Sequence, residues 1–167
     1  RNKMQYPRDK IVHSLDELAR KRHELKHNNE EKIVLTSGCF DLLHGGHLEY
    51  ICNASTYGFL IVGVNSDNFV RRLKGPLRPI RDQEDRLFTI AGFVPVGLAA
   101  IFDDDIALIQ AVQPDIYVAS KTSHIRIWDD NYRLRTLRGM GTTIVELPAF
   151  KKDSTTNIIA RVGGVVA

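Results

Sequence analysis

Two histidines stand at the start of an expected helix, directly after a short β-rich run. The run covers residues 32–37 and is followed by GCFDLLHGGH, residues 38–47. His44 and His47 are three positions apart, so one helical turn can present both imidazoles to the same site. Imidazoles donate hydrogen bonds and can carry charge near neutral pH. Because glycines also let the backbone approach a bulky anion, the segment is typical of a site that stabilises negative charge on phosphorus.

Two other interpretations of this histidine pair stay open. The imidazoles could bind a metal ion, but no further Cys or His stands at supporting spacing, so we expect no metal held by the protein. They could also be ordinary polar residues at a helix start. The chain contains no glycine-rich dinucleotide motif, no P-loop and no nucleophile elbow, which excludes those classes of phosphate-binding or hydrolytic site.

A basic segment supplies further candidates. Residues 71–86 hold six Arg or Lys against three Asp or Glu, a balance of +3 that equals the net charge of the whole chain. The segment is either a solvated face or a polyphosphate site. Lys74 is the candidate for a mobile cation that reaches phosphates, with a solvated lysine before a turn as the alternative. Arg86 either serves a triphosphate or pairs with Asp82 or Asp85 on its own helix.

Three consecutive hydroxyl residues, Ser154, Thr155 and Thr156, open the last expected helix. One hydroxyl is enough to cap a helix. Three hydroxyls together with the free backbone N–H groups of a helix N-terminus can form an anion pocket. A second phosphate-binding element is therefore expected here, with a plain N-cap as the alternative.

Strands and helices alternate along the chain. The expected helices span residues 14–28, 47–57, 66–73, 82–93, 106–112, 128–138 and 154–162, and the expected strands 32–37, 59–64, 98–102, 115–119 and 142–147. This alternation predicts a single α/β domain over residues 1–167, a doubly wound (Rossmann-like) parallel sheet with helices on both faces. Residues 1–12 are expected to be an N-terminal extension. Ligands of such sheets bind at the carboxyl ends of the strands, which is where the histidines fall.

Composition sets outer bounds on function. The chain has 167 residues, of which 43% are hydrophobic and 26% charged, as in an ordinary soluble domain. A net charge of +3 is too mild to indicate a nucleic-acid partner. One long uncharged stretch, residues 87–102, is broken by glycine and proline and is too short to span a bilayer, so no membrane partner is expected. The two cysteines form no CxxC pair and no export signal is evident, which favours a cytoplasmic location.

Residues 38–47 resemble the signature of the nucleotidyltransferase superfamily that carries the H-x-G-H motif. Further segments are similar, in order and spacing, to the branch formed by the nucleotidyltransferase domains of bifunctional ADP-heptose synthases. These segments are residues 64–67, 70–76, 78–80, 84–86 and 154–159. The resemblance covers about residues 10–163, nearly the whole chain.

The resemblance implies an enzyme that joins a nucleoside triphosphate to a phosphorylated acceptor and releases pyrophosphate, with Mg²⁺ expected by class. A sugar 1-phosphate such as heptose 1-phosphate is the leading acceptor, with adenylyl transfer from ATP. One alternative is a cytidylyltransferase that uses CTP and an alditol phosphate or a phosphonate. Another is a catalytically inactive, nucleotide-binding regulatory domain. Members of the superfamily are commonly dimers, so a homodimer is expected.

The resemblance also implies roles for individual residues. His44, His47 and Lys74 are the implied catalytic residues. The implied nucleotide-binding residues are Gly38, Cys39, Phe40, Asp41, Gly46, Asp67, Arg86, Ser154, Thr155 and Thr156. A phosphate monoester is already mostly ionised at neutral pH, so the acceptor needs no general base and the protein has only to position groups and neutralise charge.

The chain departs from the branch at three places. Where relatives usually carry Lys-Gly-x-Asp-Tyr, this chain has ASKTSH, residues 119–124, and the acidic residue is missing. Thr-Ser-Gly, residues 36–38, stands where Thr-Asn-Gly is usual, and Lys-Lys-Asp, residues 151–153, where Glu-Gly is common. Four basic residues, Lys121, His124, Lys151 and Lys152, either bind a more anionic acceptor or are surface charges. Lys121 and His124 are the acceptor-binding candidates.

Overall fold

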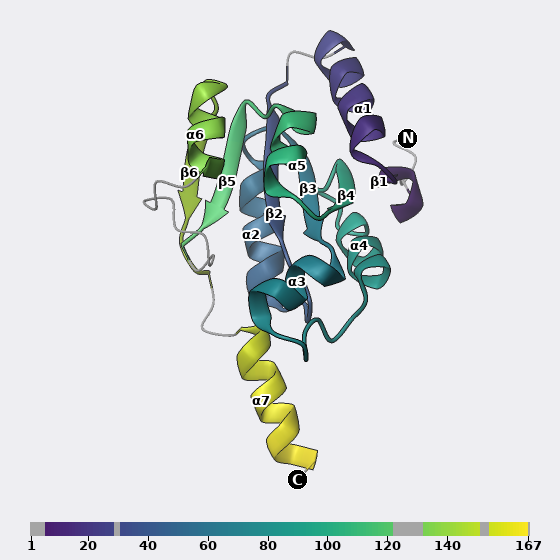
Figure 1. Ribbon diagram of the computed structural model, residues 1–167, viewed down its shortest axis with the longest axis vertical. Coiled ribbons are helices and arrows are strands. Elements are labelled where there is room, and N and C mark those ends of the chain that lie inside the picture. The colour runs from purple at the N-terminus through teal and green to yellow at the C-terminus, as the bar shows by residue number, and fades with distance from the viewer. Residues whose placement is uncertain (1–5, 29–30, 122–131, 151–153, 167) are drawn as a thin grey trace.

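The computed structural model describes residues 6–28, 31–121, 132–150 and 154–166 (Figure 1). In this part of the chain every strand pairing is parallel, and the sheet has the order β1-β4-β3-β2-β5-β6. The strands are β1 (Ile11–Val12), β2 (Ile33–Gly38), β3 (Phe59–Asn65), β4 (Leu98–Phe102), β5 (Ile116–Ser120) and β6 (Thr143–Leu147). The expected doubly wound parallel sheet is confirmed.

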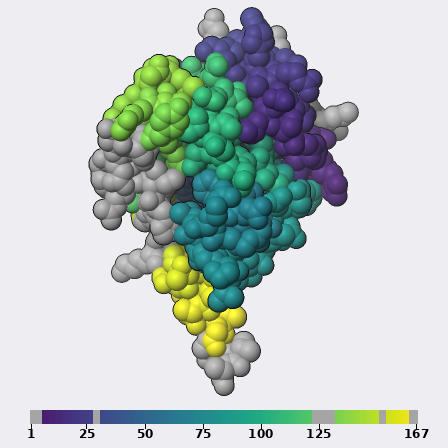
Figure 2. Space-filling model, viewed as in Figure 1, coloured from purple at the N-terminus to yellow at the C-terminus, as the bar shows by residue number. Residues whose placement is uncertain are grey.

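Helices cover both faces of the sheet, as expected. One face packs against α1 (Leu15–Asn28), α5 (Asp105–Val112) and α6 (Tyr132–Gly139), and the other against α2 (Gly45–Ser55) and α4 (Gln83–Ala91). A short α3 (Asp67–Lys74) follows β3, and α7 (Thr155–Val166) extends beyond the carboxyl ends of the strands (Figures 1 and 2). None of the described helices combines the length and the apolar character needed to cross a membrane.

Alternation along the central strands builds two cores. On β2, Val34 packs with the α2 and α4 side, whereas Leu35 packs with the α1, α5 and α6 side. Successive side chains of a strand point to opposite faces. A strand that is covered on both faces must therefore be apolar throughout, which is why these strands appear as continuous hydrophobic runs in the sequence.

Local capping sets where the helices begin. Ser14 Oγ accepts from the Glu17 backbone N–H at 3.1 Å, and the Glu17 carboxylate accepts from the His13 N–H at 3.1 Å. Ser14 therefore caps the helix as the sequence indicates, while the Glu17 carboxylate binds the N–H of the residue before the N-cap instead of the N-cap N–H of a full capping box. Asp82 Oδ1 accepts from the Asp85 N–H at 2.8 Å and begins α4 in the same way.

The first strand differs from the sequence expectation. Residues 1–12 were expected to form an extension, but Ile11 pairs with Ala99 as part of edge strand β1, and Val12 is buried. A one-turn 3₁₀ helix, η1 (Pro7–Lys10), leads into it, and Lys10 Nζ donates to the Phe93 carbonyl at 3.0 Å. A two-residue strand has no periodicity, so only pairing with β4 reveals it.

The order of the strands fixes where a ligand can bind. From β2 the sheet continues through β3 and β4 on one side and through β5 and β6 on the other. Crossover helices leave the two halves on opposite faces, and a crevice opens at the carboxyl ends of the two strands where the order reverses. In this protein those strands are β2 and β5.

Candidate active site

A cavity of about 520 Å³ opens at the carboxyl ends of β2 and β5. The start of α2, the end of α3 and the start of α7 reach it from other parts of the chain. Eleven residues expected from the sequence line it: Gly38, Cys39, Phe40, Asp41, His44, Gly46, His47, Lys74, Ser154, Thr155 and Thr156. The fold thus brings together side chains that lie more than a hundred positions apart.

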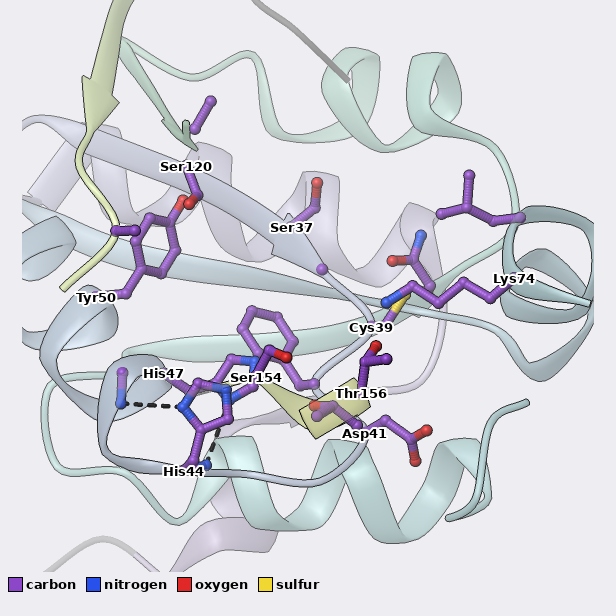
Figure 3. A pocket seen from close by; sticks show the side chains of 18 of the residues that line it. Ser37, Cys39, Asp41, His44, His47, Tyr50, Lys74, Ser120, Ser154 and Thr156 are labelled. Atoms are coloured by element: carbon purple, nitrogen blue, oxygen red, sulfur yellow. Dashed lines mark hydrogen bonds between the residues drawn. The ribbon is translucent and has the colours of Figure 1, made fainter. Parts of the chain in front are cut away.

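Backbone N–H groups at the start of α2 orient the two histidines (Figure 3). His44 is the N-cap of α2, and its Nδ1 accepts from the Gly46 backbone N–H at 3.1 Å. His47 Nδ1 accepts from the His44 backbone N–H at 3.4 Å, and the ring centroids lie 4.1 Å apart. A neutral imidazole whose Nδ1 accepts carries its proton on Nε2. Both rings therefore offer an Nε2–H as a donor.

His47 is uncharged at neutral pH in the free protein. Burial first, and then the electrostatic effects of His44 and Lys74, lower the pKa of His47 from 6.5 to about 4. The charge of Lys74 therefore reaches the imidazole, and both residues line the same cavity. A neutral Nε2–H still donates a hydrogen bond. It is too weak an acid to give its proton to a bound phosphate.

We expect an NMR titration of the free protein to give His47 a midpoint near 4, well below 6.5. The unfolded chain binds this proton at higher pH than the folded protein does. Folding stability from this group is therefore complete above pH 6.5 and declines as the pH falls toward 4. Inorganic triphosphate should raise the midpoint, because it brings negative charge to the ring. A midpoint near 6.5 in the folded, free protein would contradict the buried environment.

The start of α7 uses its three hydroxyls differently. Ser154 Oγ accepts from the Asn157 backbone N–H at 3.1 Å and is the N-cap. Thr155 Oγ1 donates to the Leu42 carbonyl at 3.0 Å and ties the helix start to the segment that carries His44. Thr156 lines the cavity, and its hydroxyl has no partner among the described residues. One hydroxyl caps, one tethers, and the third is available to a ligand.

Lys74 is the last residue of α3, and Figure 3 shows its side chain extending toward Cys39. Burial raises the pKa of the Cys39 thiol, even though Lys74, Arg86 and Arg78 act in the opposite direction. A thiol held protonated is a poor nucleophile. Lys74 therefore supplies positive charge to the cavity, and Cys39 supplies part of its wall.

A family model described as cytidylyltransferase-like matches residues 35–161. The chain belongs to the cytidylyltransferase-like family. Among curated relatives, the bifunctional protein HldE of Helicobacter pylori strain P12 is 45% identical over 115 residues, which are 67% of this chain and 22% of that protein. HldE of Wolinella succinogenes is 51% identical over 90 residues, 52% of this chain and 19% of that protein. The chain spans about a fifth of the length of these relatives.

Solved structures agree with this family. The lipopolysaccharide core biosynthesis protein from Thermoplasma volcanium superposes with a TM-score of 0.61 and 27% identity, over 74% of this chain and 99% of that one. Pantothenate synthetase from Thermus thermophilus has a TM-score of 0.60 at 19% identity, over 89% of this chain and 67% of that one, which shows a shared fold. The matching family model identifies this domain as a cytidylyltransferase-like nucleotidyltransferase.

In this nucleotidyltransferase Arg86, one candidate for binding the triphosphate, does not line the cavity. Its side chain is fully buried and outside the lining. It donates to the Cys39 carbonyl at 2.6 Å, to the Arg81 carbonyl at 3.0 Å and to Asp67 Oδ1 at 2.8 Å. The pairing with Asp82 or Asp85 is also not formed. Arg86 instead joins α4, α3 and the loop after β2, because a buried guanidinium needs several acceptors at once.

Asp67 and Asp41, both expected to bind nucleotide, have structural partners. Asp67 is the carboxylate partner of Arg86 and does not line the cavity. Asp41 is 1% exposed, and its carboxylate accepts from Arg78 Nε at 2.7 Å and from the N–H groups of Ile80 and Arg81 at 3.0 Å. Burial acts to raise the pKa of Asp41, but these hydrogen bonds hold it below its usual value. Asp41 thus fixes the loop beside the cavity.

The remaining predicted residues fall in three groups. Phe40 lines the cavity and is also part of the buried core, with a left-handed φ of 48°. Lys121 is exposed, lies 3.9 Å from Glu146 Oε1 and does not line the cavity. His124 and residues 151–153 lie outside the described part of the chain. The structure therefore gives Lys121 no contact with the site.

Several lining residues were missed by sequence reasoning. They are Ser37, Tyr50, Asn65, Phe69, Leu73, Arg78, Tyr117, Val118, Ala119, Ser120, Arg133, Asn157 and the segment Pro148, Ala149, Phe150. Three of them end or nearly end a parallel strand: Ser37, Asn65 and Ser120. The rule that ligands bind at carboxyl ends could have identified those three. Tyr117 lies inside a strand and Arg133 on a helix, and no motif marks either one.

Proposed function

We propose that this nucleotidyltransferase transfers the adenylyl group of ATP to a sugar 1-phosphate such as heptose 1-phosphate, with release of pyrophosphate. The observation that carries the proposal is the meeting, in one cavity, of two Nε2–H donors, the Lys74 cation and the start of α7. The HldE relatives and the resemblance to ADP-heptose synthases support the choice of acceptor.

The proposed reaction is an in-line displacement. An oxygen of the acceptor phosphate forms a bond to the α-phosphorus, and the bond between that phosphorus and the bridging oxygen to the β-phosphate breaks. Because the acceptor phosphate is already ionised, catalysis consists of positioning and charge stabilisation. His44 and His47 would donate to oxygens on which negative charge grows, and Lys74 would neutralise the departing pyrophosphate.

The lining of the cavity does not fit a resident Mg²⁺ ion. Mg²⁺ prefers carboxylate and phosphate oxygens in octahedral geometry. Asp41 is the one carboxylate among the described lining residues, and its oxygens are taken by Arg78, Ile80 and Arg81. The Mg²⁺ expected by class would therefore be bound by the oxygens of the triphosphate.

The deciding experiment is pyrophosphate release measured with ATP, CTP, GTP and UTP against heptose 1-phosphate, glycerol 3-phosphate and an alkyl phosphonate. We expect the highest kcat/KM for ATP with heptose 1-phosphate. Reactions without acceptor provide the background of simple hydrolysis. Absence of pyrophosphate above that background with every pair would refute the proposal and favour the inactive regulatory domain.

A cytidylyltransferase for an alditol phosphate or a phosphonate is the second candidate. The description of the matching family favours it. So does the loop after β5, where the acidic residue typical of the branch is missing and Ser120 borders the cavity. A higher kcat/KM for CTP with glycerol 3-phosphate or the phosphonate in the same panel would select it.

We also propose that the domain forms a homodimer and acts in the cytoplasm, where nucleotides and sugar phosphates are found. The helix α7 supports self-association, since it extends from the rest of the domain and Val162 is 57% exposed on it (Figure 2). Sedimentation at micromolar concentration should show a dimer, and a monomer would contradict this.

A further inference from the structure

The carboxyl end of β2 separates two halves of the cavity. Thr36 Oγ1 lies 2.7 Å from Tyr50 Oη of α2, on the face of the sheet that α2 covers. Ser37, the next residue, points to the opposite face, where its Oγ lies 3.2 Å from Tyr117 Oη. Both Ser37 and the two histidines line the cavity, and Figure 3 shows them on different sides of the β2 ribbon. The cavity therefore has a histidine half and a Ser37 half.

A chain of hydrogen bonds ends in the Ser37 half. Arg133 of α6 pairs through Nη2 with the Asp105 carboxylate and donates through Nη1 to Tyr117 Oη at 3.0 Å. A guanidinium can only donate, so the Tyr117 hydroxyl accepts there and has its own proton to give to Ser37 Oγ. Either hydroxyl can donate in this contact, and with Tyr117 as the donor the Ser37 hydroxyl keeps its proton for a ligand. The order Asp105, Arg133, Tyr117, Ser37 is a relay whose last donor faces the cavity.

Burying the polar groups of this relay costs folding stability, so their presence calls for a functional reason. Arg133 is 9% exposed and Tyr117 5%, in a sheet face otherwise packed with apolar side chains. Apolar residues of similar volume often replace a buried ion pair without loss of stability. Three of its members, Ser37, Tyr117 and Arg133, line the cavity. We therefore explain these polar side chains by their position at the cavity and not by packing of the core.

The geometry of the reaction indicates which substrate meets the relay. The α7 start is tethered beside His44 through Thr155, so the triphosphate elements gather in the histidine half. In an in-line displacement the attacking oxygen and the leaving group lie on opposite sides of the phosphorus. The acceptor must therefore approach from the side away from the departing pyrophosphate. The Ser37 half offers polar groups away from the two histidines.

The charge balance indicates what the relay recognises. Asp105 already neutralises Arg133, so the relay delivers a hydrogen-bond donor and no net charge. A neutral donor suits a hydroxyl or ring oxygen better than a second carboxylate or phosphate. We propose that Ser37, positioned by Tyr117 and Arg133, hydrogen-bonds a sugar hydroxyl or ring oxygen of the acceptor and so selects a polyhydroxylated phosphate. This inference rests on the proposed function.

The test is a double-mutant cycle of Ser37→Ala and Tyr117→Phe, assayed by pyrophosphate release with ATP and heptose 1-phosphate. Each single variant should raise the acceptor KM by about 3- to 10-fold, the loss of one neutral hydrogen bond, with the KM for ATP unchanged. Tyr117 acts through Ser37, so in the Ser37→Ala background the Tyr117→Phe change should add no further rise. A purely structural role would not produce this dependence.

Thr142→Val is the matched control. Thr142 Oγ1 donates to the Pro114 carbonyl at 2.8 Å, and the residue is buried but does not line the cavity. The variant therefore loses one buried hydrogen bond near the amino ends of β5 and β6, away from the cavity. Its acceptor KM should equal that of the unaltered protein. Thermal unfolding of all variants measures any general loss of stability.

The outcomes separate this inference from the proposed function. Turnover of heptose 1-phosphate by the unaltered protein, with an unchanged acceptor KM in Ser37→Ala, would overturn the inference alone. Equal rises in both KM values, or additive effects in the double variant, would also overturn it. No turnover with any acceptor by the unaltered protein would refute the proposed function and the inference together.

Discussion

Replacement of His47 by alanine is expected to lower kcat by about 10²–10³-fold, the usual loss when one donor to transition-state charge is removed. His47 Nδ1 is occupied by the His44 backbone N–H, so Nε2–H is the group that the variant deletes. The KM for the triphosphate should change less than kcat, because Lys74 and the start of α7 remain. Steady-state pyrophosphate release at saturating substrates measures both constants.

The matched control is His27→Ala. His27 is exposed on α1, and its Nε2 lies 3.2 Å from His23 Nε2, far from the cavity lining. Its kcat should equal that of the unaltered protein. A correctly folded His47→Ala protein with near-normal kcat would remove His47 from the catalytic site, and circular dichroism of both variants establishes folding.

Replacement of Arg86 by alanine should lower the free energy of unfolding by about 3–5 kcal/mol, the range for breaking a buried ion pair. The variant would leave the Asp67 carboxylate without its cation and the Cys39 and Arg81 carbonyls without a donor. It would also leave a void, since the Arg86 side chain is fully buried. Equilibrium unfolding in urea measures the change.

Arg72→Ala controls for the loss of an arginine. Arg72 Nη2 lies 3.3 Å from Asp103 Oδ1, and both side chains are 59% exposed. An exposed pair of this kind contributes about 0–1 kcal/mol. If Arg86→Ala also lowered the free energy of unfolding by less than about 1 kcal/mol, the contacts of Arg86 would not be what holds α4 to the loop after β2.

The sequence by itself determined the class of fold and the centre of the site. Continuous apolar strands separated by capped helices are consistent only with a parallel sheet covered on both faces, and the structure has that sheet. The pair His44 and His47, and the hydroxyls at the start of α7, carry their chemistry in short local motifs. Local spacing therefore identified them, and the fold places both in one cavity.

Long-range contacts decided what the sequence left open. The same basic segment holds Lys74, which lines the cavity, and Arg86, which is buried against Asp67 and two carbonyls. Residue type and spacing do not distinguish these two cations, because the difference arises from packing between α3, α4 and the loop after β2. Edge strand β1 likewise exists only through its pairing with β4.

The Ser37 half of the cavity depends entirely on tertiary structure. Asp105, Tyr117 and Arg133 come from α5, β5 and α6, and none forms a motif with Ser37 on β2. They meet because parallel pairing puts β5 beside β2 while α5 and α6 pack on the same face of the sheet. Sequence spacing records neighbours along the chain, whereas a hydrogen-bond relay across four elements depends on which strands are adjacent and which faces the helices cover.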